Sequence, residues 1–255
     1  MQAPTLVHLT LLLLIWLLTA GIGHARSLVI EQFQADIQVL SGGDLLVTET
    51  IRPRFAGSWN GLKRDIPVEY RTPQGFNYTL LLDLVSVTDE RQTPLKYESF
   101  RDRHYRSFKI WLPGAQDATK TLVLTYRVAN GLKYFEDHDE LYWNVTGDEW
   151  DVPIESASAR VLLPAKATGV KALAFSGAYG AREQQADVRI EGSEIRYQMT
   201  RPLGFREGLA GDTTAIARQL VAEAAARART LFEELSRSWA APGAAVAASA
   251  VALEG

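Results

Sequence analysis

Apolar and polar side chains alternate with a period of two from Arg26 to about Thr200. Such alternation is typical of strands that bury one face, because successive side chains of a strand point to opposite sides. Clusters of Asn, Gly, Pro and Asp interrupt it at short intervals. Beyond residue 60 the expected strands are 78–88, 107–112, 121–129, 158–163, 170–175, 187–190 and 195–199. Many short strands at this spacing predict an all-β fold, an antiparallel β-sandwich rather than a parallel α/β sheet.

The first two strands, around residues 29–39 and 45–55, are expected to form a hairpin. Their apolar side chains share one face only if Val39 lies opposite Leu45, because a slip of one residue turns every side chain of a strand to the other face. That register requires a three-residue loop, Ser41 to Gly43, with Gly43 in the left-handed conformation of a G1 bulge.

This register places Glu31 and Glu49 on the apolar face, where an unpaired carboxylate is costly. Glu49 lies in the middle of its strand and most needs a partner. The nearest candidates are Lys63 and Arg64. We expect a structural Glu49–Arg64 ion pair, since the guanidinium fork suits a partly buried carboxylate. A catalytic role for Glu49 is the alternative.

The stretch Leu141–Ile154 reads as strand, turn, strand, with Pro153 marking the second strand as an edge or a bulge. Its candidate binding residues are Trp143, Asn144, Asp148, Glu149 and Trp150. Aromatic faces beside carboxylates are typical of glycan sites, and paired carboxylates serve as acid and base in glycosidases. Packing of both tryptophans in the core, with an acidic pair in the turn, is the alternative.

Other chemistry is not indicated by the sequence. It has no phosphate-binding glycine loop, no G-x-S-x-G elbow and no H-E-x-x-H helix, so we expect no catalytic residue, no cofactor and no metal site. The acidic run 136–140 does not have the spacing of a calcium loop and is interpreted as a solvated loop. The basic run 101–106 is likewise expected to be an exposed loop, with contact to a membrane surface as the alternative.

The N-terminus predicts export. Leu9 to Leu18 is an apolar run broken only by Thr10, and the small residues Gly23 and Ala25 fit a cleavage site. Residues 1–25 are therefore expected to be a signal peptide, with an uncleaved signal anchor as the alternative. A net charge of −3 gives no case for a nucleic-acid partner, and the absence of cysteine excludes disulfides and thiolate sites.

Three sequence elements resemble one family. They are the S-G-G-D-L-L-V-T-E stretch at 41–49, the G-L-K-R-D-I-P stretch at 61–67, and 141–154, which resembles a Y-W-N-x-x-G-x-x-W-x-x-P-I motif. The family is the bacterial predicted membrane proteins catalogued as domain of unknown function 2207. The resemblance implies a signal peptide, an extracytoplasmic β-sandwich and membrane association, and it implies no catalytic residue, substrate or cofactor.

Residues 26–209 are therefore expected to form an extracytoplasmic β-sandwich, Ig-like or related. Residues 210–255 are rich in alanine and arginine, and 212–239 suits a helix. Because the resemblance implies an apolar strand and a membrane span there, a shifted reading frame or a truncated gene is our hypothesis for this segment. The expected function is a non-catalytic cell-envelope domain whose partner is an envelope protein or a glycan. A carbohydrate-active hydrolase using Glu49, Asp148 or Glu149 is the alternative.

Overall fold

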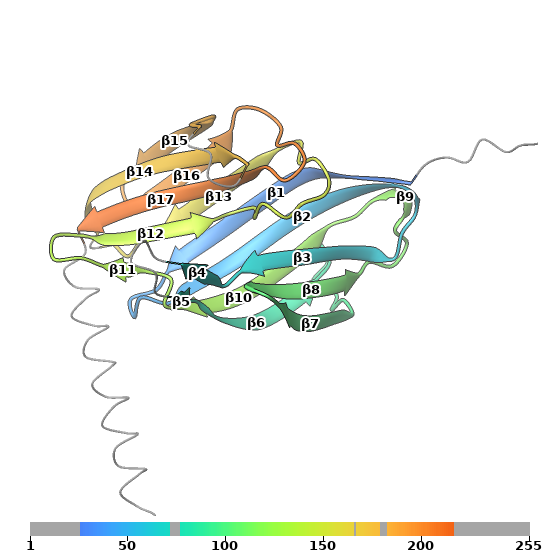
Figure 1. The fold of residues 1–255 in the computed structure, drawn as a ribbon, viewed down its shortest axis with the longest axis horizontal. Coiled ribbons are helices and arrows are strands. Elements are labelled where there is room, and N and C mark those ends of the chain that lie inside the picture. Colours follow the sequence, from blue (N-terminus) through green and yellow to red (C-terminus); the bar gives the residue numbers. More distant parts are fainter. Residues whose placement is uncertain (1–25, 72–76, 166, 179–182, 217–255) are drawn as a thin grey trace, which may run out of the picture.

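The computed structural model describes residues 26–71, 77–165, 167–178 and 183–216. This part of the chain is all-β, as the alternation predicts. The expected signal sequence at 1–25, and residues 217–255 of the C-terminal segment, lie outside the described residues. Figure 1 shows the long strands β1, β2 and β10 behind a front layer that contains β17, β12 and β3.

The first two strands, of 13 and 14 residues, are the longest of the described residues. In chain order they are β1 (Ser27–Val39), β2 (Leu45–Ser58), β3 (Gly61–Pro67), β4 (Glu69–Arg71), β5 (Asn77–Thr79), β6 (Leu81–Thr88), β7 (Tyr97–Asp102), β8 (Tyr105–Trp111), β9 (Gln116–Thr119), β10 (Leu122–Ala129), β11 (Lys133–Tyr134), β12 (Asp139–Asn144), β13 (Ala157–Leu162), β14 (Thr168–Gly177), β15 (Ala186–Glu191), β16 (Glu194–Met199) and β17 (Gly208–Ile216).

One large sheet has the order β15-β16-β13-β1-β2-β10-β6, with β9 paired to β2. The smaller sheets are β11-β12-β17-β14, β3-β8-β7 and β4-β5. The predicted antiparallel pairing is found between all neighbouring strands of the described residues except β1 and β13, which pair in parallel, Phe33 beside Ala157. The long chain between these two strands leaves room for the crossover that a parallel pair requires.

The β1–β2 hairpin has the register predicted from its sequence. Val39 lies opposite Leu45. The Leu40 N–H donates to the Asp44 carbonyl at 2.8 Å and closes the three-residue loop, in which the Gly43 N–H donates to the Leu40 carbonyl at 2.9 Å. Gly43 has a φ of +83°, the left-handed conformation of the G1 bulge. This part of the prediction is confirmed.

The placement of Glu31 on the apolar face is wrong. The pairing of β1 with β2 shifts between Ile30 and Gln32, so Ile30 is buried and Glu31 turns outward. There Glu31 pairs with Arg52 and Arg54 at 3.3 and 3.0 Å. A bulge inserts one residue into a strand and reverses the alternation beyond it, which relieves the cost of a buried carboxylate.

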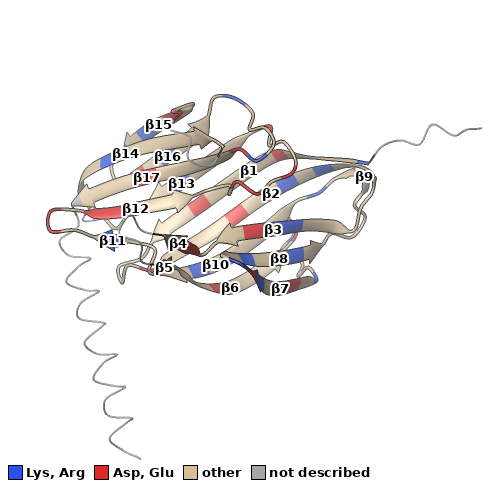
Figure 2. Cartoon of the chain, viewed as in Figure 1, with Lys and Arg blue, Asp and Glu red and all other residues tan. Residues whose placement is uncertain are grey.

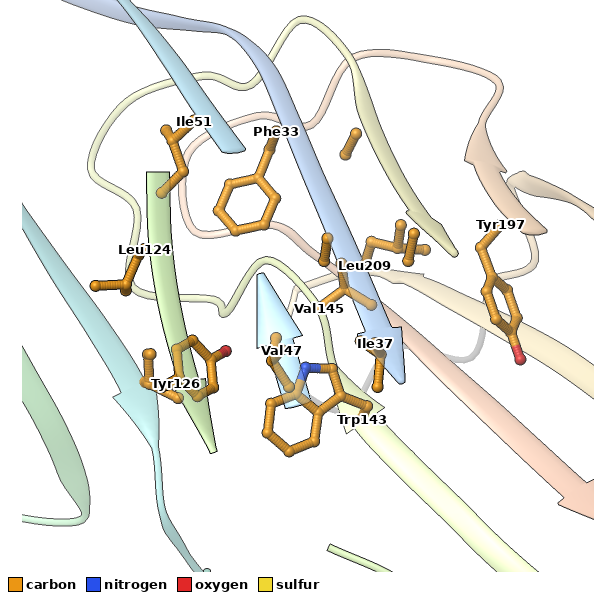
Figure 3. Close-up of a cluster of buried hydrophobic side chains, with 14 of the residues drawn as sticks. Phe33, Ile37, Val47, Ile51, Leu124, Tyr126, Trp143, Val145, Tyr197 and Leu209 are labelled. Carbon is orange, nitrogen blue, oxygen red and sulfur yellow. The ribbon is translucent and has the colours of Figure 1, made fainter. Parts of the chain in front are cut away.

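The core lies between the large sheet and the smaller sheets. Figure 3 shows the Trp143 indole beside Tyr126 and Val47, with Val145 and Leu209 nearby. The rings of Tyr126 and Trp143 stack at a centroid distance of 6.4 Å. The two layers are therefore joined through aromatic side chains of β10 and β12.

Three local expectations need correction. Residues 150–154 do not form a strand. Ile154 makes only isolated bridges, to Ile30 and Leu203, because the peptide groups there bond to two different segments of the chain. The basic run 101–106 is not a loop but the tip of the β7–β8 hairpin, whose turn is Arg103–His104. The helix expected from Asp212 is wrong for 212–216, since β17 continues the β pattern past Leu209 and pairs with both β12 and β14.

Candidate functional site

Three segments that are distant in the sequence meet at one buried position. Glu49 comes from β2, Arg64 from β3, and the carbonyl groups of Val145 and Thr146 follow β12. We call this position, with Tyr126 of β10, the buried polar cluster. The inward alternation of β2 puts Glu49 there, and that of β3 puts Arg64 there, between Leu62 and Ile66.

The structure brings Glu49 and Arg64 into direct contact. The Arg64 Nε donates to Oε2 of Glu49 at 2.8 Å and Nη2 donates to Oε1 at 2.7 Å. Nη1 donates to the carbonyls of Asp65 and Thr146 at 2.8 and 2.7 Å, and Nη2 reaches the carbonyl of Val145 at 3.3 Å. A guanidinium has five N–H donors, and every one has an acceptor here.

Burial and the charge of Glu49 together set the direction in which the pKa values of Arg64 and Tyr126 shift. Burial by itself lowers the pKa of Arg64, but the Glu49 carboxylate outweighs burial and raises it. Burial, together with Glu49, raises the pKa of Tyr126 well above its usual value. The Tyr126 hydroxyl therefore stays protonated and donates to Oε1 of Glu49 at 2.7 Å.

The turn after β12 is shaped around Arg64. The Asn144 Oδ1 accepts the Gly147 N–H at 3.0 Å. Gly147 has a φ of +77°, and a Cβ there would lie 2.9 Å from Nη1 of Arg64. The Trp150 indole donates to the Thr146 carbonyl at 2.8 Å. A structural role therefore explains each of Asn144, Gly147 and Trp150.

Both tryptophans of this segment are buried. Trp143 is 3% exposed and Trp150 is 6% exposed. Trp150 meets Phe33 edge-on at a centroid distance of 6.2 Å, and both rings flank the Arg64 guanidinium. A platform for sugar rings needs accessible indole faces, so these two side chains do not provide one.

The outer face of β12 borders a pocket of about 310 Å³. The side chains that give it its chemistry are Tyr70, Tyr142, Asn144, Asp148, Phe175 and Ser176. Tyr142 is 42% exposed. The Asp148 carboxylate has no hydrogen-bond or ionic partner among the described residues. We call this the Asp148 pocket.

Glu149 lies on the other side of the same turn, beside a groove of about 760 Å³. It accepts a hydrogen bond from the Tyr105 hydroxyl at 3.0 Å and lies 3.8 Å from Arg206. Asp148 does not line this groove, and Glu149 does not line the Asp148 pocket. The two neighbouring carboxylates therefore face different depressions.

Sequence reasoning missed Tyr126 and Tyr70, whereas Tyr142 stands among the aromatic residues that the sequence places beside Asp148 and Glu149. Tyr126 occupies an inward position in the alternation of 121–129, and that period is the signal that places it next to Glu49. Tyr70 gives no such signal, because β4 is only three residues long. Among the described residues no cluster of three or more acidic or histidine side chains could hold a metal. The described residues also include no helix of the length and apolarity that a membrane crossing needs.

Comparison with known proteins agrees with the resemblance. The sequence profile of the family described as "Predicted membrane protein (DUF2207) N-terminal domain" matches residues 29–214. No curated protein is significantly similar to the chain. Among solved structures, yeast leukotriene A4 hydrolase with bestatin has 10% identity and a TM-score of 0.48, over 72% of this chain and 28% of that one.

The M1 zinc metallopeptidase of Deinococcus radiodurans has 12% identity and a TM-score of 0.43, over 73% of this chain and 42% of that one. The chain thus spans less than half the length of these solved structures.

Proposed function

This chain belongs to the predicted membrane protein (DUF2207) family, and on that premise we propose that residues 26–216 form a non-catalytic binding domain outside the cytoplasmic membrane. The apolar run Leu9–Leu18 supports export. The family description supports attachment of the whole protein to a membrane. The domain then presents its surface to envelope components.

The Asp148 pocket is the proposed binding site, and a hydroxyl-rich ligand such as an envelope glycan is the proposed occupant. The observation that carries this proposal is the unpaired Asp148 carboxylate beside the exposed Tyr142 ring. Asn144 uses its oxygen for Gly147, which leaves its NH₂ group as a donor. An aromatic face, an acceptor and a donor are the groups that a sugar ring with several hydroxyls requires.

No observation favours the hydrolase alternative. Glu49 is fully buried and paired with Arg64, so it cannot reach a substrate. Asp148 and Glu149 line different depressions. A glycosidase needs two carboxyl groups roughly 5–9.5 Å apart that flank one bond of the sugar.

Calorimetric titration of the full chain with chitotetraose and with soluble muropeptides tests the proposal. The Asp148→Ala and Tyr142→Ala variants are expected to weaken binding by about tenfold each, the loss of one good contact. Asp83→Ala is the matched control, because Asp83 is exposed on β6 outside the pocket. Absence of binding, or equal binding by wild type and Asp148→Ala, overturns the proposal.

A further inference from the structure

Strand β3 lies at the edge of its sheet, and no other strand of the described residues pairs with its outer side. The Leu112 N–H donates to the Asn60 carbonyl at 2.9 Å, and the Val68 N–H donates to the His104 carbonyl at 2.8 Å. In an antiparallel pair, hydrogen-bonded residues alternate along the strand. These two bonds therefore show which residues of β3 bond to β8. The peptide groups of residues 62, 64 and 66 face β8, and those of the odd-numbered residues point away from it.

The outward peptide groups belong to Gly61, Lys63 and Asp65. The Asp65 carbonyl is taken by Nη1 of Arg64. Within the described ranges, no partner reaches the N–H or carbonyl of Gly61 or Lys63. An edge with unpaired donors and acceptors is a template on which another strand can form.

This edge opens into the groove beside Glu149, which we call the aromatic groove. Its lining includes Trp59, Trp111, Val152 and the largely buried Trp150. Gly61 has a φ of +151°, and a Cβ there would lie 1.9 Å from the Ile110 carbonyl oxygen, so the position admits only glycine. Glycine at this position therefore lets β3 and β8 approach each other closely.

The free charge in the groove is positive. Its carboxylates are already engaged: Asp65 with Lys63 at 3.0 Å, and Asp151 and Glu149 with Arg206 at 3.3 and 3.8 Å. Arg26 and Lys109 lie over the rings of Trp59 and Trp111. Neither has a carboxylate partner in the part of the chain that the structure describes. Figure 2 shows basic residues on the adjoining strands β3 and β8.

From these observations we infer that the aromatic groove binds an extended acidic segment of another protein, which adds as a strand to the outer edge of β3. The peptide groups of Gly61 and Lys63 supply the backbone hydrogen bonds. Lys109 lies on the outward face of β8 and, with Arg26, attracts the acidic side chains of the added strand. The apolar side chains on alternate positions face inward and meet Leu28 and Val152, which line the groove and pack on the core. This site is separate from the Asp148 pocket and does not depend on glycan binding.

Hydrogen exchange of the full chain gives the direct test. The probe is a capped hexapeptide with alternating glutamate and valine, and its counterpart has lysine in place of glutamate. The amides of Gly61 and Lys63 exchange rapidly in the free protein, because they have no acceptor. A saturating amount of the acidic peptide is expected to slow both by about tenfold or more, and the lysine peptide is expected to leave them unchanged.

Matched variants separate backbone pairing from side-chain contact. Lys63→Pro removes the outward N–H and no bond to β8, whereas Lys63→Ala keeps that N–H. Lys63→Pro is expected to weaken peptide binding about tenfold relative to Lys63→Ala. Lys109→Glu is expected to weaken the acidic peptide and strengthen the lysine peptide.

Equal binding by Lys63→Pro and Lys63→Ala overturns strand addition. So does unchanged exchange of the Gly61 and Lys63 amides in the wild type at millimolar peptide, a measurement that does not depend on any variant folding. Equal affinity for the acidic and the lysine peptide overturns the assigned charge of the partner.

Discussion

Glu49 and Arg64 form a two-pronged ion pair with distances of 2.7 and 2.8 Å, and neither side chain has more than 1% of its surface exposed. The pair joins β2 of the large sheet to β3 of a smaller one. The same guanidinium holds the carbonyls of Val145 and Thr146. A single side chain therefore ties together all three sequence elements that carry the family resemblance, which gives those elements a structural explanation.

Arg64→Met is expected to destabilise the fold by about 3–5 kcal/mol, because it leaves the Glu49 carboxylate buried without a counter-charge. Urea unfolding followed by tryptophan fluorescence measures the change. The double variant with Glu49→Leu removes both charges and is expected to be more stable than Arg64→Met alone. If the double variant is the less stable of the two, the uncompensated charge is not the cause.

Gly147→Ala is expected to cost roughly 1–2 kcal/mol more than Gly192→Ala. Both glycines have positive φ, +77° and +63°, so the backbone conformation is unfavourable for alanine at both positions. Only at Gly147 would the new Cβ meet Arg64, whereas at Gly192 nothing lies within 4 Å. Thermal unfolding of the two variants isolates the contact. Equal losses would show that Arg64 moves aside without cost.

Tyr126→Phe is expected to lower stability at pH 7 by about 1.5–3 kcal/mol, because the Tyr126 hydroxyl donates to a charged carboxylate. Burial, and then Glu49, raises the pKa of Tyr126. The folded protein thus keeps a proton that the unfolded chain loses above about pH 10. This stabilisation is complete below that pH and is lost as the pH rises further.

Denaturant unfolding between pH 8 and about pH 11 is therefore expected to show a flatter stability profile for Tyr126→Phe than for the wild type. Tyr97→Phe, an exposed position, is the matched control. An unchanged slope in Tyr126→Phe contradicts the prediction.

Asp139→Asn is expected to stabilise the protein by roughly 1 kcal/mol at pH 7. Asp139 is 5% exposed, and its Oδ2 has no hydrogen-bond partner in the described part of the chain. Burial raises the pKa of Asp139, so the folded state favours the neutral carboxyl. That preference stabilises the fold at low pH and is lost as the pH rises.

The gain from Asp139→Asn is therefore expected to shrink between pH 7 and about pH 3, where the wild-type carboxyl is protonated. Urea unfolding at both pH values measures it. Asp137→Asn serves as the control, because Asp137 is exposed and His138 lowers the pKa of its carboxyl. A gain of the same size at both pH values would rule out ionisation of Asp139 as its origin.

The sequence by itself determined the local β structure. The alternation of β1 and β2, with Gly43 in their loop, fixes the pairing of Val39 with Leu45, because strand period and turn geometry depend on neighbouring residues only. The same period turns Glu49 toward the core, where a charged side chain needs a partner. The prediction of Arg64 as the partner of Glu49 follows from that requirement and from the short separation of the two residues in the sequence.

The remaining features were decided only by the tertiary structure, because they depend on contacts between segments that are distant in the sequence. The bulge that turns Glu31 outward, the parallel pairing of β1 with β13, and the two depressions that separate Asp148 from Glu149 have no local signal. The unpaired edge of β3 is of the same kind. Which strands become neighbours is settled by how two apolar layers cover each other, and the alternation within one strand does not encode that choice.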